Sequence, residues 1–274
     1  CVIPDLPWIA QRAITTLLPQ IDPYEMRFYA VAQASLAVSL VACAGFALLS
    51  RRPRHVFLLL SVNAVLHLLL DALQTKWANG VHLFAPFSWT IWNAGWFWPE
   101  SPWTWILTAL GLGAFAWLWR ERPPVQVAPA PAIRRQRALA VVALGVVYMA
   151  APLILRAGPE EADSHFARTL RDRAVRVGRA VEFDREGLVV TDAGTFVKTL
   201  SGERIALVGA PVSGQPISIR GVFSARDQIR VSDWHDHSSW PRSAVSYLGL
   251  ALTLACWLRF WISAWRTVRG GVGR

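Results

Sequence analysis

Residues 66–89 read LHLLLDALQTKWANGVHLFAPFSW, and they mark the point where an apolar run gives way to a polar connector. His67 and Asp71 stand four residues apart at the end of that run, and His82 follows the connector. Positions i and i+4 share a helix face, so the imidazole of His67 and the carboxylate of Asp71 are predicted to lie together. Such a pair can form the edge of a metal site or an acid/base pair.

The composition indicates an integral membrane protein. Of the 274 residues, 54% are hydrophobic and 15 are Trp, and the mean hydropathy is +0.33. These values exceed those of an ordinary soluble domain. The net charge is +10, but the basic residues cluster at the ends of apolar runs, as they do in inner-membrane proteins. Because the sequence lacks a stripe of alternating basic and aromatic residues, nucleic-acid binding is not expected.

Five apolar runs approach the ~20 residues that cross a bilayer as a helix. They cover residues 27–50, 55–73, 103–119, 139–155 and 244–264. Clusters of Arg follow the first, third and fifth runs, so the positive-inside rule places those ends in the cytoplasm. We therefore predict a multi-pass protein of the bacterial inner membrane, in contact with the lipid bilayer. Residues 8–18 are predicted to form a short amphipathic helix at the membrane surface.

The runs divide the chain into parts. A Pro- and Ala-rich linker, which contains PPVQVAPAP, separates two membrane units. The predicted parts are an N-terminal membrane unit with three spans (1–120), the linker (121–138), a fourth span (139–157), an external β-rich domain (158–242), and a fifth span with a basic tail (243–274). The start of the chain at Cys1 has two interpretations, a lipidated mature N-terminus or a missing upstream segment, and we favour the second. Cys43 and Cys256 lie within apolar runs and show no metal-type spacing.

The external domain is predicted to begin with a helix over residues 160–179 and to continue as a small sheet. The solvated face of that helix is expected to carry Arg171, Asp172, Arg173 and Arg176. Short runs of alternating hydrophobicity follow, at residues 180–183, 187–191, 195–200, 204–208, 216–223 and 228–232. Turn sequences such as DREG and VSGQ separate them. The predicted fold is thus an α-helical integral membrane protein with about five transmembrane helices and an all-β, OB-like extracytoplasmic domain.

Four polar residues are predicted to converge on the external side: Asp5, His67, Asp71 and His82. Two imidazoles and two carboxylates suit a divalent metal, zinc above all, with positions left open for water. Asp5 and Asp71 would act as ligands or as the general base. Each residue also has a structural interpretation. Asp71 would cap its span or pair with Lys76, His67 would be a core histidine, His82 would belong to an interfacial aromatic belt, and Asp5 would form an Asx turn.

Two further segments are candidates for function. Residues 233–237 read DWHDH, and a strand would point His235 and His237 to the same side as a second metal pair. A polar surface loop is the alternative interpretation. Residues 89–103 read WTIWNAGWFWPESPW. This segment is typical of an interfacial belt, and the alternatives are a lid for lipid tails or a docking surface for other membrane subunits.

Three motifs in this chain occur together: PDLP at 4–7, HLLLD at 67–71 and GVHLFAPFSW at 80–89. In this respect residues 1–120 resemble the membrane-bound metal-dependent hydrolases of the YbcI/YdjM type. The resemblance implies a multi-span membrane protein with a metal site. Members of that family usually carry a motif like HRGxTHS at the start of a span. Residues 29–36 occupy the matching place here and retain Ser35 and Leu36, but they lack both histidines.

Two hypotheses of function therefore remain open. The first is a metal-dependent hydrolase that acts on an ester or phosphoester of an amphiphilic substrate at the outer face of the membrane. The second is a non-catalytic accessory or scaffold subunit of a larger membrane complex, in which the metal site has decayed.

Overall fold

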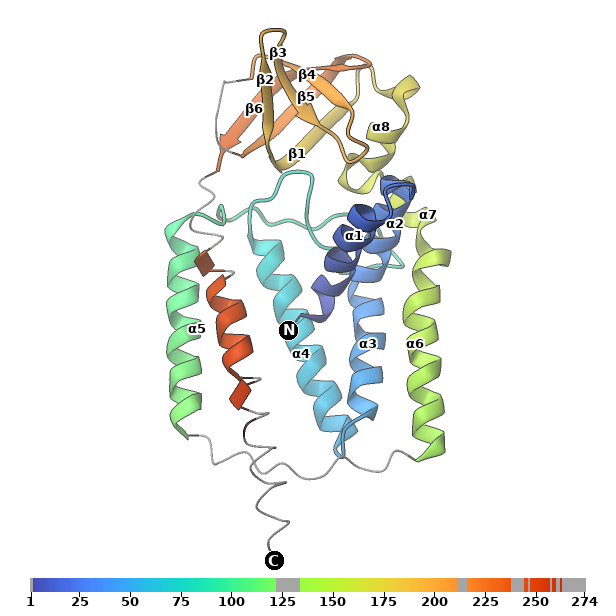
Figure 1. The fold of residues 1–274 in the computed structure, drawn as a ribbon, viewed down its shortest axis with the longest axis vertical. Helices are drawn as coiled ribbons and strands as arrows, with labels where there is room; N and C mark the ends of the chain where they lie inside the picture. The colour runs from blue at the N-terminus through green and yellow to red at the C-terminus, as the bar shows by residue number, and fades with distance from the viewer. Residues whose placement is uncertain are drawn as a thin grey trace, which may run out of the picture. The chain divides into compact units, whose positions relative to one another are not determined.

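The computed structural model describes residues 2–121, 134–210, 216–237, 244–245, 247–256, 258–259 and 262. The chain forms two compact units, and each is described by itself. The first unit combines Cys1–Trp98 with Ile133–His237, and the second combines Pro99–Ala132 with Ser238–Arg274. All six strands and most of the helices belong to the first unit (Figure 1).

The helices of the first unit follow the apolar runs of the sequence. Outside residues 157–175, which are described below, they are a short 3-10 turn η1 (Ile3–Asp5), α1 (Leu6–Leu17), α2 (Pro23–Ala34), α3 (Leu36–Leu48), α4 (Pro53–Leu73) and α6 (Arg135–Leu155). Helix α3 packs beside both α4 and α6 (Figure 1). The short helix expected over residues 8–18 is confirmed as α1. It begins two residues earlier because Pro7 falls in the first turn, where a missing N–H costs nothing.

Among the described helices, two are long and apolar enough to cross a membrane, namely α4 and the segment Arg135–Glu161. The pair α2 and α3 amounts to a third if it is one span, but it bends by 65° between the two helices. The continuous helix expected over residues 27–50 is therefore broken. Ser35 explains the break, because its hydroxyl donates to the Ala32 carbonyl at 2.7 Å and its backbone is extended, with ψ 152°.

The second unit contains α5 (Pro102–Glu121) and the shorter apolar helix Tyr247–Cys256. Helix α5 lies where the third span is expected, and it is not one of the two helices that are apolar enough to cross a membrane. Six of the 21 residues in the run predicted at 244–264, and residues 122–133 of the predicted linker, lie outside the described residues.

Six strands form one sheet in the order β1-β5-β6-β4-β3-β2. Their bounds are β1 (Ala180–Glu186), β2 (Leu188–Thr191), β3 (Gly194–Lys198), β4 (Arg204–Val208), β5 (Ile217–Ala225) and β6 (Gln228–Asp236). All six strands predicted from alternating hydrophobicity are confirmed. Strands β4 and β6 are parallel, and the other neighbours are antiparallel. Only Gly187 separates β1 from β2, so one nearly continuous strand supplies both ends of the strand order.

The helix predicted over residues 160–179 is wrong. Four short pieces replace it: α7 (Ala157–Glu161), η2 (Ser164–Phe166), α8 (Ala167–Arg171) and η3 (Arg173–Val175). Asp163, His165 and Phe166 take left-handed backbone angles, with φ of 49°, 58° and 55°, and this ends the helix. The Asp163 carboxylate stabilises the turn by accepting hydrogen bonds from the backbone N–H and the hydroxyl of Thr169.

Helix α2 packs against the sheet. Phe28 is fully buried and belongs, with Tyr24, to the same hydrophobic cluster as Val181, Ile205 and Ile219 of the strands. The Tyr24 hydroxyl also lies 3.3 Å from Ser201 Oγ, between β3 and β4. Helix α2 and the sheet of the first unit therefore share one core.

Arg176 is fully buried and does not lie on a solvated face as predicted. Its guanidinium meets Glu203 through two bonds, Nη1 to Oε1 at 2.9 Å and Nη2 to Oε2 at 2.7 Å. It also donates to the carbonyl oxygens of Thr169, Leu170 and Arg226. These hydrogen bonds hold the pKa of the Glu203 carboxyl below its ordinary value.

We expect Glu203→Gln to lower the free energy of unfolding by about 3 kcal/mol, because it leaves the buried charge of Arg176 uncompensated. The matched control is Arg173→Gln, which removes an arginine whose Nε lies 3.2 Å from Glu203 but whose side chain is 66% exposed. It is expected to cost less than about 1 kcal/mol.

Thermal unfolding of the detergent-solubilised protein measures both changes. The stabilisation by Glu203 is present above its ordinary pKa of 4.5 and is lost as the pH falls through the lower pKa of the folded state. Equal effects of the two variants would contradict this account of the buried pair.

Candidate functional site

Packing of the first residues places Asp5 beside α4. Ile3 is buried against Ala42 and Cys43 of α3 and Ala64 of α4. These neighbours are small, so the turn η1 approaches both helices closely. As a result, Asp5 at the end of η1 meets the last turns of α4, more than sixty residues further along the chain.

Three of the four predicted site residues come together there. His67 Nε2 lies 3.3 Å from Asp5 Oδ1 and 3.7 Å from Asp71 Oδ2. One ligand atom of each residue falls within 4.8 Å of the other two. Metal–ligand bonds of ~2.1 Å at tetrahedral angles separate ligand atoms by about 3.4 Å, so this spacing fits a small divalent cation. The side chains are 23%, 45% and 34% exposed for His67, Asp5 and Asp71, although the ligand atom His67 Nε2 is itself buried.

Asp71 also has the partner that its structural interpretation requires. Lys76 Nζ lies 2.8 Å from Asp71 Oδ1, and the lysine side chain is only 12% exposed. Asp71 thus contacts Lys76 with one carboxylate oxygen and faces His67 with the other. The ammonium fixes the carboxylate, and its charge opposes a second cation nearby.

His82 lies away from this cluster. After α4 the chain forms a loop closed by two hydrogen bonds between Val81 and Trp92, of 3.1 and 2.9 Å. This loop directs the His82 ring toward His165 and Trp89, at centroid distances of 6.2 and 5.8 Å. His82 is only 5% exposed. The convergence predicted for four residues therefore holds for three of them.

Burial keeps the imidazoles of His82 and His165 neutral. It lowers the pKa of His82 to about 4, because a buried ring pays a large desolvation cost for its charge. The pKa of His165 is also well below its ordinary value, through burial and the nearby charge of Arg27. Sequence reasoning missed His165, since it lies in a charged segment that was expected to be helical.

Of the second predicted pair, His235 lies on β6 and His237 directly follows that strand. The rings of His235 and His237 meet edge to face at 4.8 Å, and Trp98 stacks on His235 at 3.8 Å. His237 Nε2 lies 2.7 Å from the hydroxyl of Ser218, and its Nδ1 accepts from Arg185 Nε at 3.4 Å. Both ring nitrogens of His237 thus take part in hydrogen bonds within the sheet.

We expect His82→Phe to make stability less dependent on pH. As the pH falls from the ordinary pKa of 6.5 toward 4, the unfolded chain binds a proton that the folded protein does not. The stabilisation from neutral His82 is therefore present above pH 6.5 and declines below it, by about 2 kcal/mol between pH 7 and pH 5.

Thermal unfolding across that range measures the effect, and the control is His55→Phe at an exposed position on α4. An unchanged pH dependence in His82→Phe would mean that His82 titrates normally in the folded protein.

Comparison of this chain with protein-family models, with curated proteins and with solved structures finds no match. Hypotheses about its function therefore rest on its own residues and on the resemblance of its motifs.

Proposed function

We propose that this protein is a membrane-bound metal-dependent hydrolase whose ion is held by Asp5, His67 and Asp71. The observation that carries the proposal is the spacing of their ligand atoms, 3.3 and 3.7 Å from His67 Nε2. An imidazole with two carboxylates is a common donor set for divalent ions, and zinc suits it best among them. The partly exposed side chains leave positions open for water and substrate.

A divalent ion bound there would polarise an ester or phosphoester and lower the pKa of water at the site. Asp5 has the most exposed side chain of the three and is suited to accept a proton with its second carboxylate oxygen. Lys76 holds Asp71 in a fixed orientation through its ion pair.

The substrate class follows from the surroundings. Phe84, Phe87 and Trp96 are exposed on the loop that follows α4. Large exposed apolar side chains on the segment that follows a polar cluster suit an amphiphilic substrate, one end of which lies in lipid. The loop would then act as an apolar surface for its tail.

The proposal includes a membrane topology. Helix α5 and the run at 244–264 would be the third and fifth of five spans, and the Arg clusters would lie in the cytoplasm of a bacterial cell. The site and the sheet would then lie on the outer face. The sheet would be an OB-like barrel, supported by the parallel pair β4–β6 and by the near-continuity of β1 with β2. The resemblance of residues 1–120 to the YbcI/YdjM-type hydrolases belongs to the same proposal.

One observation favours a second candidate function, an accessory subunit without catalysis. The 2.8 Å ion pair with Lys76 already neutralises one of the three ligands, and the His82 ring lies elsewhere. The two histidines of the HRGxTHS motif are also missing. In such a subunit the Trp-rich loop would dock on a neighbouring membrane protein.

We expect the purified protein to contain close to one equivalent of zinc or another divalent metal. The double variant His67→Ala/Asp71→Ala should lose it, because one carboxylate binds weakly alone. The control is His55→Ala, on the opposite end of α4 and exposed, which should retain the metal. Elemental mass spectrometry gives the content. A folded wild-type protein without metal, even after incubation with zinc, would rule out the hydrolase and favour the accessory subunit.

The variant Lys76→Met also distinguishes the metal-dependent hydrolase from the accessory subunit. At a metal site the loss of the competing ammonium should strengthen zinc binding, by about tenfold if the change is worth ~1.4 kcal/mol. If Asp71 serves only the ion pair, the variant should unfold at lower temperature and should not gain zinc affinity. Zinc titration and thermal unfolding of the same preparation give both values.

A further inference from the structure

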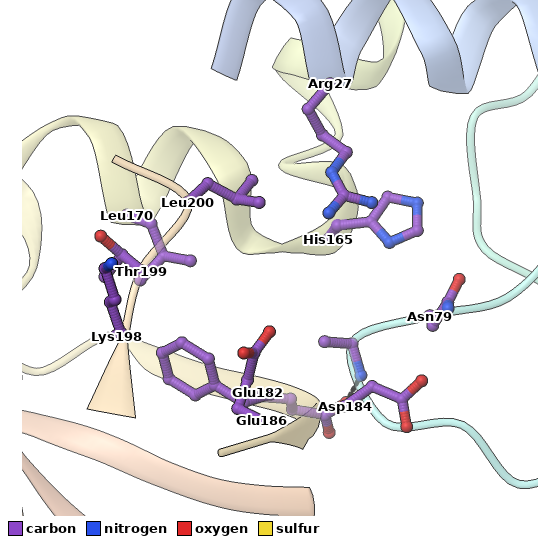
Figure 2. Close-up of a pocket in the computed structure, with 12 residues that line it drawn as sticks. Arg27, Asn79, His165, Leu170, Glu182, Asp184, Glu186, Lys198, Thr199 and Leu200 are labelled. Atoms are coloured by element: carbon purple, nitrogen blue, oxygen red, sulfur yellow. Dashed lines mark hydrogen bonds between the residues drawn. The ribbon is translucent and has the colours of Figure 1, made fainter. Parts of the chain in front are cut away.

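A cavity of about 110 Å³ lies between α2, the loop after α4, and β1 (Figure 2). Charged and polar side chains dominate its walls, which makes it a poor site for an apolar ligand. None of its lining residues belongs to the Asp5, His67 and Asp71 cluster. The cavity is therefore a separate feature of the first unit.

Arg27 and His165 form one wall, with their side chains close together (Figure 2). Arg27 Nε and His165 Nε2 are buried and have no hydrogen-bond partner among the described residues. Trp8 orients both groups, since its ring lies 5.3 Å from the Arg27 guanidinium and 5.6 Å from the His165 ring. Arg27 Nε is a donor, whereas Nε2 of the neutral His165 ring is an acceptor, because the ring already bonds the Ala78 backbone. Unpartnered buried polar atoms are costly, and they are expected where a ligand supplies the partner.

The backbone that presents His165 is strained. His165 and Phe166 both adopt left-handed angles, with φ of 58° and 55°. Non-glycine residues in this region cost on the order of 1–3 kcal/mol each, and such strain gathers at ligand sites. The Asp163 carboxylate holds the turn through Thr169, so the position of the His165 ring is fixed before any ligand arrives.

Carboxylates of β1 form the facing wall, from Glu182, Asp184 and Glu186 (Figure 2). Glu182 is already occupied, since it accepts from Ala78 N at 2.7 Å and pairs with Arg220 at 2.7 Å. Asp184 accepts only the Ser218 hydroxyl among the described residues, at 3.2 Å. Burial raises the pKa of Glu186, and the charge of Arg27 across the cavity lowers it again by a smaller amount.

Each wall excludes a simple ligand. A divalent cation would meet the charge of Arg27, and a simple anion would meet Asp184 and Glu186. Arg27 and Glu186 interact across the space without an ion pair between them in the described part of the chain. A ligand that carries both signs of charge satisfies both walls.

We propose that this cavity binds a small zwitterion. Arg27 holds its acidic group, and Glu186 and Asp184 hold its primary ammonium. The volume suits a molecule of a few heavy atoms, such as an amino acid or the phosphoethanolamine headgroup of a lipid. The site does not depend on the metal-dependent activity.

The test is isothermal titration of the full protein in maltoside detergent with phosphoethanolamine, glycine, phosphate and ethanolamine. We expect at least one zwitterion to bind about tenfold more tightly than phosphate or ethanolamine, because it satisfies both walls. Arg27→Gln should weaken its binding by about tenfold or more. Glu186→Gln should remove the advantage of phosphoethanolamine over phosphate. The controls Arg179→Gln and Asp192→Asn change exposed charges of the same domain and should bind as the wild type does.

A measurement on the wild-type protein tests the proposal even if the variants do not fold. In ¹⁵N-histidine spectra, a bound zwitterion should shift the resonance of His165 and leave that of the exposed His55 unchanged. The proposal would be overturned if neither zwitterion binds to the wild type, or if Arg27→Gln and Glu186→Gln both bind the zwitterions as tightly as the wild type does.

Competition by phosphatidylethanolamine in nanodiscs would assign the site to a lipid headgroup, and the failure of this lipid to compete would assign it to a soluble zwitterion. Binding should persist in His67→Ala/Asp71→Ala, which separates this site from the metal site.

Discussion

The burial of Phe28 joins helix α2 to the sheet, and it sets the position of the cavity that lies between them. Phe28 lies in the middle of α2 and yet packs in the core of the strands. One residue earlier, Arg27 must then lie at the boundary between helix and sheet, where it lines the cavity. A residue of this size, buried in a shared core, costs several kcal/mol to remove, so the sheet is not a loosely tethered appendage.

The loop after α4 contacts both the candidate metal site and the sheet. Lys76 pairs with Asp71 on the helix, and two residues later Ala78 N donates to Glu182 of β1 at 2.7 Å. Asn93 stabilises the loop from within, since its side-chain amide donates to the carbonyl oxygens of Lys76 and Asn79. A short piece of chain therefore contacts the metal cluster at one end and the cavity at the other.

The helices and strands of this fold can be predicted from the sequence more fully than the contacts between them. The six strands are readable because alternating residues face one core and turn residues separate the runs. The break at Ser35 cannot be predicted from the sequence in this way, since a single hydroxyl in an apolar run leaves the hydropathy of the run nearly unchanged. The burial of Arg176 depends on Glu203, which is 27 residues away in sequence, and no local pattern indicates that pair. His67 and Asp71 are readable from helical spacing alone, whereas the contact with Asp5 depends on the packing of Ile3.

The position of the cluster on α4 follows from the cost of burying charge. The helix exposes Leu58, Val62 and Leu66 at 61%, 48% and 52% along its length, a pattern that is unfavourable in water and favourable in lipid. A carboxylate in the middle of such a surface would cost several kcal/mol, whereas in the last turn it reaches water and a lysine. His67 and Asp71 therefore lie near the C-terminal end of α4, where ionised groups are tolerated, as Arg54 is at the other end. The proposed metal site would then contact an apolar and an aqueous phase at once, because an apolar helix surface precedes it and a lysine follows it.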